Sequence, residues 1–157
     1  MRYTTRKVTL SSGEAKLKLL VLIPSDGGRT DRPGVLWLHG GGYKTGMAGM
    51  AHISRARDLV RRYGAVVVSP AYRLAGRTPY PAALLDCHRA LLYLRRHASE
   101  LGVRSDQLMV GGESAGGGLA AALCMFEKDT GGVNVAFQMP LYPMLDCRDT
   151  VTSRDNH

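Results

Sequence analysis

Two clusters of glycine each follow a short apolar segment, and this arrangement limits the folds open to the chain more than any other feature. Residues 35–38 lead directly into His39-Gly40-Gly41-Gly42, and residues 107–110 lead into Gly111-Gly112 and then Gly116-Gly117-Gly118. Clustered glycine marks a backbone that turns sharply or approaches another group closely. The sequence therefore predicts two tight loops, each built at the end of a strand.

The segments around these loops alternate between strand-like and helix-like patterns. Strands are expected at 16–23, 35–38, 65–69, 107–110 and 133–139, and helices at 54–63, 81–99 and 115–127. Pro81 suits the first position of the second helix. That helix is expected to bury an apolar stripe formed by Leu84, Leu85, His88, Leu91, Leu92 and Leu94. The alternation predicts an α/β fold, a doubly wound and mostly parallel sheet with helices on both faces.

The length and charge of the chain narrow the function classes. A chain of 157 residues suits one domain, expected to span 1–157. The formal net charge is +8, but no run of Lys or Arg is interleaved with aromatic residues. We interpret the charge as solvated helix faces and expect no nucleic-acid partner. A nucleic-acid binder would instead show a steep dependence of binding on salt.

Three isolated cysteines, Cys87, Cys124 and Cys147, form no C-x-x-C pair. They indicate neither a disulfide framework nor a zinc site, so no metal is expected. Free thiols are typical of a reducing compartment, which predicts a cytoplasmic protein. The apolar segments have the length of strands, so no membrane partner is expected.

The strongest chemical motif is Gly112-Glu113-Ser114-Ala115-Gly116, which fits G-x-S-x-G between a predicted strand and a predicted helix. A strand-to-helix elbow of this kind strains the serine backbone and exposes its hydroxyl. Side chains at positions 112 and 116 would collide in so tight a turn. The alternative is a glycine-rich helix entry with Ser114 as its N-cap.

The second motif is His39-Gly40-Gly41-Gly42-Tyr43, again after a predicted strand. Acyl transfer needs backbone N–H donors aimed at a developing oxyanion, and glycines let the main chain approach closely. The alternatives are a flexible loop or a phosphate cradle, although the Gly-Lys-Ser/Thr of a P-loop is missing. We expect His39 to hold this loop by hydrogen bonding rather than to act as a base.

Four motifs in this order resemble the hormone-sensitive-lipase-like branch of the α/β-hydrolases, the bacterial esterase and acetyl-esterase family. They are His39-Gly40-Gly41-Gly42-Tyr43, Tyr72-Arg73-Leu74-Ala75 with Tyr80-Pro81-Ala82-Ala83, Gly112-Glu113-Ser114-Ala115-Gly116-Gly117, and Tyr142-Pro143-Met144-Leu145-Asp146. The resemblance implies that Ser114 is the nucleophile of a serine carboxylic-ester hydrolase for short-chain acyl esters. It implies that Gly41, Gly42 and Ala115 donate N–H groups to the oxyanion, and that no cofactor is used.

Other positions matching the family motifs are implied to be structural. Glu113 is expected to support the elbow, and Asp86 with Arg73 to form a buried polar network. Tyr43 either lines the acyl pocket or serves packing. His52, His88 and His97 precede the serine and are expected to be surface or core residues.

The chain departs from the family after Ser114. The fold orders its triad as serine, acid and histidine, but the family's Asp-Pro-Leu and terminal histidine segments are not found. The histidine that follows Ser114 is His157, which Asp146, Asp149 or Asp155 would have to orient. A terminal residue is usually mobile, so we expect an incomplete hydrolase domain, lacking the last strands and helices and inactive as this fragment.

Two further expectations follow from the resemblance. The sheet begins within the first ten residues, so the family's cap is reduced or absent. The strand at 133–139 becomes a hydrophobic edge through which the chain self-associates. The alternative function is a non-catalytic binding module or pseudoenzyme that retains the hydrolase pocket.

Overall fold

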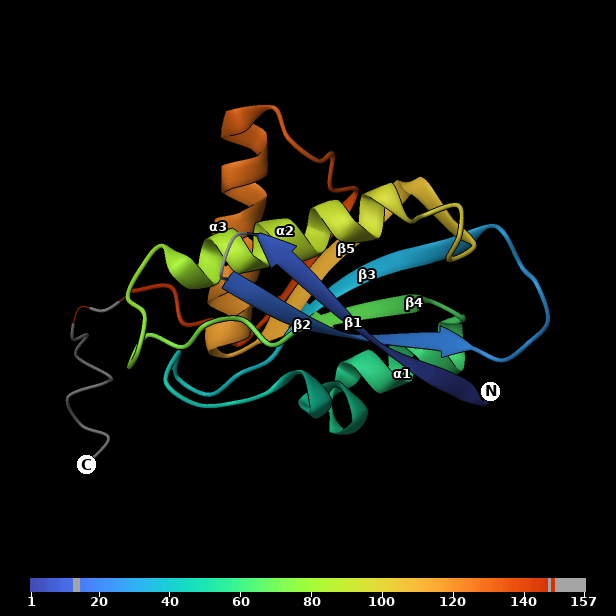
Figure 1. Cartoon of the computed structure of the whole chain (residues 1–157), viewed down its shortest axis with the longest axis horizontal. Helices are drawn as coiled ribbons and strands as arrows, with labels where there is room; N and C mark the ends of the chain where they lie inside the picture. The colour runs from blue at the N-terminus through green and yellow to red at the C-terminus, as the bar shows by residue number, and fades with distance from the viewer. Residues whose placement is uncertain (13–14, 147, 149–157) are drawn as a thin grey trace.

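A single six-stranded sheet, flanked by helices on both faces, forms the centre of the molecule (Figure 1). The computed structural model describes residues 1–12, 15–146 and 148. The elements are β1 (Tyr3–Ser12), β2 (Ala15–Pro24), β3 (Arg32–Leu38), η1 (Ala48–Ile53), α1 (Arg55–Tyr63), β4 (Val66–Pro70), α2 (Ala82–Arg96), β5 (Val103–Glu113), α3 (Ala115–Thr130) and β6 (Phe137–Leu141).

The sheet has the order β1-β2-β4-β3-β5-β6. Strands β4, β3, β5 and β6 are parallel, whereas β1 and β2 form an antiparallel hairpin that joins β4 through β2. The predicted α/β class with a mostly parallel sheet is therefore confirmed. The loops after β3, β4 and β6 gather at one edge of the sheet, on the left of Figure 1.

Alternation along β3 divides the core into two layers. Val35 and Trp37 face one side of the sheet, where they pack with Val60 of α1. Leu36 and Leu38 face the other side, where α2 and α3 cover them. Side chains of successive strand residues point to opposite faces, so a continuous apolar strand fills both layers at once.

Local capping explains where α1 begins and ends. The Ser54 hydroxyl accepts a hydrogen bond from the Ala56 N–H at 3.3 Å, which satisfies one free donor of the first turn. Gly64 adopts the left-handed conformation at φ 67 and closes the helix. The helix expected at 54–63 is confirmed.

The start of α2 and part of its apolar stripe were predicted wrongly. Pro81 is the N-cap residue, and the helix begins at Ala82. Leu85 is 40% exposed, because it lies on the outer face of the helix. The small residues Cys87 and Ala90 fill the buried stripe instead, and both are fully buried.

The last strand is shifted along the chain from its predicted position at 133–139 to Phe137–Leu141. The Val133 N–H donates to Glu127 at 2.7 Å, which draws this residue into the loop after α3. Val133 is buried there and lies outside the ladder. Apolar character alone could not separate a buried loop residue from a strand residue.

The remaining sequence expectations concern the thiols and the membrane. Cys87 and Cys124 are free thiols, and Cys147 lies outside the described residues. Over the described part of the chain, no helix combines the length and apolarity that crossing a membrane requires. The cytoplasmic location stays a prediction.

Candidate active site

Ser114 lies at the turn between β5 and α3, in an uncommon backbone conformation. Its φ is 55° and its ψ is −116°, and a positive φ is unusual for a residue other than glycine. Such strain persists only where the surroundings hold it, and it concentrates at functional sites. The strand-to-helix elbow predicted from the sequence is present, and Ser114 is its central residue.

The glycines on either side of the elbow are required by close backbone contact. A Cβ atom added to Gly112 would lie 2.5 Å from the Gly116 carbonyl carbon and 2.7 Å from the Leu38 carbonyl oxygen. One added to Gly116 would overlap the Leu38 carbonyl oxygen itself. The predicted collision at positions 112 and 116 is confirmed, and it occurs with β3 as well as within the turn.

Backbone hydrogen bonds hold the strained serine in place. The Ser114 N–H donates to the Leu141 carbonyl at 3.0 Å, and the Ser114 carbonyl accepts from Gly118 at 3.0 Å and from Met144 at 3.1 Å. Strand β6 and the segment after it therefore fix the elbow from one side. The sequence motif Tyr142-Pro143 marked this segment, but its backbone role could not be read from the residues.

The glycine loop after β3 lies directly against the elbow. A Cβ atom on Gly40 would lie 3.1 Å from the Glu113 carbonyl oxygen and 3.5 Å from Ser114 Cβ. Gly41 has φ 124° and its carbonyl accepts from the Lys44 and Thr45 N–H groups at 3.0 and 2.9 Å. Two motifs that are distant in sequence thus meet at the carboxyl ends of β3 and β5.

Three backbone N–H groups near this junction are free to donate. Within the described chain, the N–H groups of Gly41 and Gly42 have no acceptor. Ala115 is the first residue of α3, and the Gly118 N–H makes the hydrogen bond to Ser114 that closes the first turn. Free N–H groups at a helix start favour a negative charge. The assignment of these donors to an oxyanion stays a prediction.

His39 is buried in the wall of the loop. Its Nδ1 is hydrogen-bonded to the Gly40 carbonyl at 2.8 Å, and its ring stacks on Tyr72 with centroids 4.1 Å apart. The Tyr72 hydroxyl donates to the His39 carbonyl at 2.7 Å. Burial lowers the pKa of the imidazole, and the bond to Gly40 offsets part of that change. The expectation that His39 holds the loop by hydrogen bonding is confirmed.

No histidine in the described residues is hydrogen-bonded to Ser114. His39 Nε2 is buried without a partner there. His52 pairs with the Tyr3 hydroxyl at 2.9 Å, His88 with Glu127 at 2.5 Å and His97 with Glu100 at 2.9 Å. These three pairings agree with the expected surface or core roles.

Of the three acidic candidates for a triad, Asp146 lies in the described residues. Asp146 forms an ion pair with Arg148 at 2.6 Å. His157, Asp149 and Asp155 lie outside the described residues.

The structural roles expected for Asp86 and Arg73 are confirmed. Asp86 is 2% exposed and accepts from the Arg73 guanidinium at 2.8 and 2.9 Å and from its backbone N–H at 3.0 Å. The Glu113 carboxylate accepts from the Arg55 N–H at 3.3 Å, at the start of α1. Glu113 thus holds the start of α1, and Asp86 holds the segment after β4.

Tyr43 connects the glycine loop to two neighbouring segments. Its hydroxyl donates to the Met144 carbonyl at 3.1 Å, and its own carbonyl accepts from the Ala75 N–H at 2.8 Å. These contacts favour the packing alternative for Tyr43. A role in lining an acyl pocket stays a prediction.

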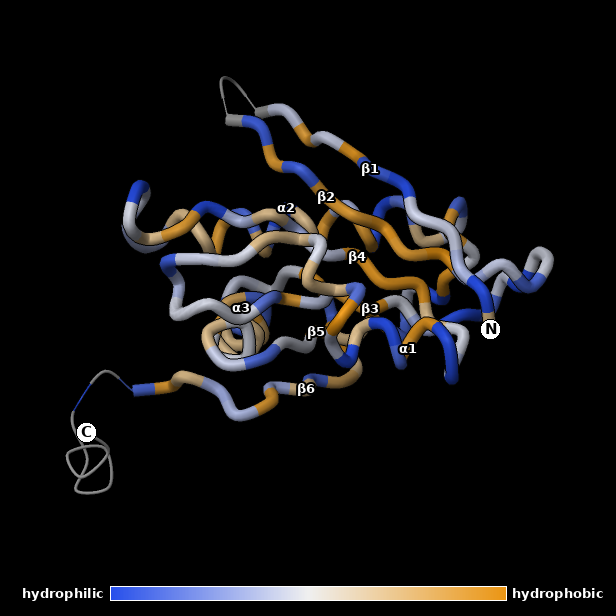
Figure 2. Tube along the Cα trace, turned by 90° about the horizontal axis from the view of Figure 1, so that it is seen from below, coloured by the Kyte–Doolittle hydropathy of each residue, from blue (hydrophilic) through white to orange (hydrophobic). Residues whose placement is uncertain are grey.

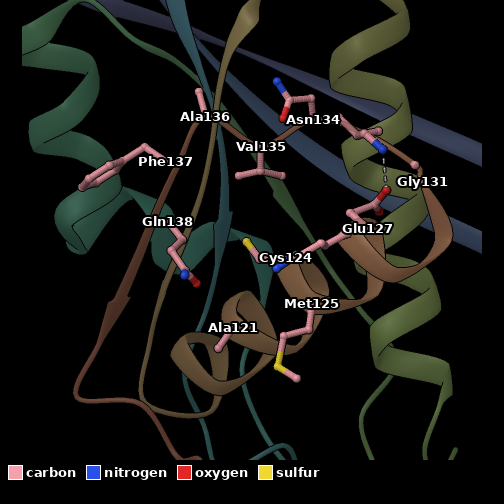
Figure 3. Close-up of a pocket in the computed structure, with 13 residues that line it drawn as sticks. Ala121, Cys124, Met125, Glu127, Gly131, Asn134, Val135, Ala136, Phe137 and Gln138 are labelled. Carbon is pink, nitrogen blue, oxygen red and sulfur yellow. Dashed lines mark hydrogen bonds between the residues drawn. The ribbon is translucent and has the colours of Figure 1, made fainter.

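A prominent cavity of the described residues lies away from Ser114. It has a volume of about 910 Å³ and lies between α3 and the segment that leads into β6. Figure 3 shows Cys124 and Met125 of α3 on one side, with Phe137 and Gln138 opposite. Neither Ser114 nor the glycine loop lines it, so backbone geometry rather than cavity size identifies the candidate site.

Comparison with known proteins places these features in a family. Residues 35–157 match the model of the alpha/beta hydrolase fold. The chain is 38% identical over 115 residues to the carboxylesterase NlhH of Mycobacterium tuberculosis, and 30% identical over 141 residues to an arylesterase of Saccharolobus solfataricus. The solved structure of a bacterial heroin esterase superimposes with a TM-score of 0.90 at 36% identity.

The chain spans only part of these relatives. The NlhH match covers 73% of the chain and 36% of NlhH, and the arylesterase match covers 90% of the chain and 45% of the arylesterase. The heroin esterase match covers 98% of the chain and 49% of that structure. From the family match and the shared geometry, the chain belongs to the α/β-hydrolase family, in its hormone-sensitive-lipase-like branch.

Proposed function

We propose that this chain supplies the nucleophile and the oxyanion donors of a serine carboxylic-ester hydrolase for short-chain acyl esters. The observation that carries the proposal is the backbone of Ser114, held at φ 55° against the glycine loop after β3. The similarity to a carboxylesterase, an arylesterase and a heroin esterase supports an ester as the substrate class.

The reaction begins with attack of the Ser114 Oγ on the ester carbonyl carbon. The carbonyl π electrons move to the oxygen and form a tetrahedral oxyanion. Collapse of this intermediate releases the alcohol, which takes up a proton, and leaves an acyl group on Ser114. Water then attacks the acyl-enzyme, which releases the acid and restores the serine.

The N–H groups of Gly41, Gly42 and Ala115 stabilise the oxyanion in this proposal. Two of them lack an acceptor within the described residues, and the third opens α3. Donors that are already in place cost no rearrangement when the charge develops. Removing one such donor in other serine hydrolases costs about 10²–10³ in kcat.

The proton of Ser114 requires a base, and we propose that neither the four described histidines nor His157 supplies it. The four described histidines are engaged elsewhere, and a general base must lie within hydrogen-bond reach of the hydroxyl. The resemblance implies a histidine oriented by an acid later in the sequence. The described residues alone are therefore expected to bind and orient an ester rather than to turn it over.

A second candidate function is favoured because, within the described residues, no histidine is hydrogen-bonded to Ser114. A binding module or pseudoenzyme would keep the elbow and the glycine loop without needing the proton transfer. Such a module would bind tetrahedral or carbonyl ligands reversibly, with no covalent step on Ser114. The two candidates differ in whether Ser114 reacts once a base is supplied.

Covalent labelling with added imidazole separates the two candidates. A p-nitrophenyl ester of an alkylphosphonate offers a phosphorus atom to Ser114 Oγ and releases p-nitrophenolate when the P–O bond to Ser114 forms. We expect about one equivalent of p-nitrophenolate per folded chain in the presence of imidazole, and faster release with an ethyl than with a decyl phosphonate. Peptide mass spectrometry should place the label on Ser114.

The control is Ser114→Ala, with folding of both proteins checked by circular dichroism. The variant should release p-nitrophenolate only at the background rate of imidazole alone. If the folded wild-type chain releases no more than this variant, the nucleophile assignment is wrong and the binding-module candidate stands.

A further inference from the structure

A second cavity, called the hollow below, lies beside the part of the β1–β2 hairpin that does not contact β4. The strands β1 and β2 pair along their full length, but β2 pairs with β4 only over residues 19–22. The end of the hairpin therefore projects beyond the sheet, as Figure 2 shows. Between β1 and α2 it encloses a hollow of about 430 Å³, lined by Thr9, Leu10, Ser11, Arg89, Leu92, Tyr93, Arg96 and His97.

The polar groups that line this hollow suit an anion. They comprise two guanidinium groups, one imidazole, two aliphatic hydroxyls and a phenol, and the lining includes no carboxylate. Two carboxylates pair with residues of this lining, Asp86 with Arg89 at 3.6 Å and Glu100 with His97 at 2.9 Å, and each also binds another arginine. Asp86 holds Arg73 at 2.8 Å, and Glu100 is shared between Arg6 and His97.

Arg89 and Arg96 retain most of their donor capacity. Arg89 is 23% exposed, with one long hydrogen bond of 3.4 Å to the Leu10 carbonyl and a contact of 3.6 Å to Asp86. Arg96 has no side-chain partner among the residues that the structure describes. Each guanidinium carries five N–H donors, and the planar fork of arginine matches the oxygens of a phosphate.

We propose that this hollow binds a small molecule carrying a phosphate monoester. Arg89 and Arg96 hold the phosphate oxygens, and the hydroxyls of Thr9 and Ser11 add neutral donors. The partly buried Leu10 and Leu92 give the organic part an apolar surface. A volume of about 430 Å³ exceeds what inorganic phosphate fills and falls within the range of about 300–1,000 Å³ common for ligand pockets.

Calorimetric titration tests this site without any need for catalysis. Phenyl phosphate is titrated into the folded chain at constant ionic strength, with inorganic phosphate as a second probe. We expect one saturable site that binds phenyl phosphate more tightly than inorganic phosphate. Charge-assisted hydrogen bonds are stronger than neutral ones, so Arg96→Gln should weaken binding about tenfold or more. The double variant Arg89→Gln/Arg96→Gln should weaken it further.

The matched control is Arg61→Gln, which removes one exposed guanidinium of α1 that does not line the hollow. It should bind phenyl phosphate like the wild-type chain. Arg96 is exposed, so its single variant keeps the test valid if the double variant fails to fold. Equal weakening by Arg61→Gln, or unchanged binding by Arg96→Gln, would overturn the site.

The Ser114→Ala variant separates this site from the proposed function. Phenyl phosphate should bind this variant as it binds the wild-type chain. Loss of binding in Ser114→Ala would place the phosphate at the elbow and would overturn the assignment to the hollow between β1 and α2.

Discussion

The two flanks of β5 differ sharply in how closely they are packed. Toward β3, glycines are required because a single added carbon at Gly112 or Gly116 would meet the backbone of the neighbouring segment. Toward β6, Phe137 is 59% exposed, and α3 and the segment before the strand line a cavity of about 910 Å³. The crowded flank carries Ser114 and the proposed oxyanion donors. The open flank is a sheet edge, although the end of β6 also holds Ser114 through Leu141.

Close packing is therefore confined to one part of the candidate site. A serine held at φ 55° requires neighbours that cannot relax, and so would the proposed oxyanion donors. A base can arrive from another part of the chain or from a longer protein, so it needs no such packing on this side. We therefore expect substitutions on the crowded flank to change stability and substitutions on the open flank to change association.

The largest effect is expected on the crowded flank. Gly116→Ala forces a Cβ atom against the Leu38 carbonyl, where backbone rather than a flexible side chain must move. We expect the free energy of unfolding to fall by about 3 kcal/mol, the upper end of typical overpacking costs. Urea denaturation measures this change.

Gly49→Ala provides the matched control for Gly116→Ala. Its added Cβ would come no closer than 3.9 Å to the Met47 side chain, so stability should change by less than about 0.5 kcal/mol. If both substitutions lower the free energy of unfolding equally, the close packing around the elbow does not contribute to stability.

On the open flank, the expected effect is on association. Strand β6 is an edge strand, as the sequence predicted, and its five residues Phe137–Leu141 carry no charge. The opposite edge, β1, carries Arg6 and Lys7, which discourage pairing with another chain. We propose that the chain self-associates through β6, and Gln138→Lys should weaken the dimer by about tenfold or more, or about 1.4 kcal/mol.

Sedimentation of the wild-type chain and the two edge variants measures this effect. Thr5→Lys adds the same charge to the β1 edge and should leave association unchanged. If the wild-type chain stays monomeric at all concentrations, the proposed β6 interface does not exist. If the two lysine substitutions weaken association equally, net charge rather than the β6 edge causes the change.

A smaller effect is expected from the pH dependence of stability. Burial lowers the pKa of His39, so below about pH 6.5 the unfolded chain binds a proton there that the folded chain resists. Its contribution to stability is therefore complete above that pH and is lost as the pH falls below it. Titration of His39 can change the free energy of unfolding by no more than about 1.4 kcal/mol per pH unit.

Urea denaturation between pH 5 and 8 compares the wild-type chain with His39→Gln. The two curves should run parallel above pH 7 and diverge below pH 6.5, with the wild-type chain losing stability more steeply. Parallel curves over the whole range would mean that His39 titrates in the folded chain as it does in the unfolded one.

The elbow and the glycine loop could be predicted because neighbouring residues in the sequence determine their backbone conformation. Glycine at positions 112 and 116 and the strand before each motif are visible in the sequence. The hydrogen bonds from Ser114 to Leu141 and from Met144 to Ser114 could not be predicted, because they join segments through backbone atoms that any residue carries. The shift of the last strand had a similar cause, since it depends on Glu127 binding the Val133 N–H.

The most direct measurement is hydrolysis of p-nitrophenyl acetate by the folded chain beside Ser114→Ala, each without and with imidazole. Without imidazole we expect equal rates, because no described histidine is hydrogen-bonded to Ser114. With imidazole we expect an excess of acetylation on Ser114 that the variant lacks. Turnover above Ser114→Ala without any added base would contradict this account, and would show that His157 or a second copy of the chain completes the site.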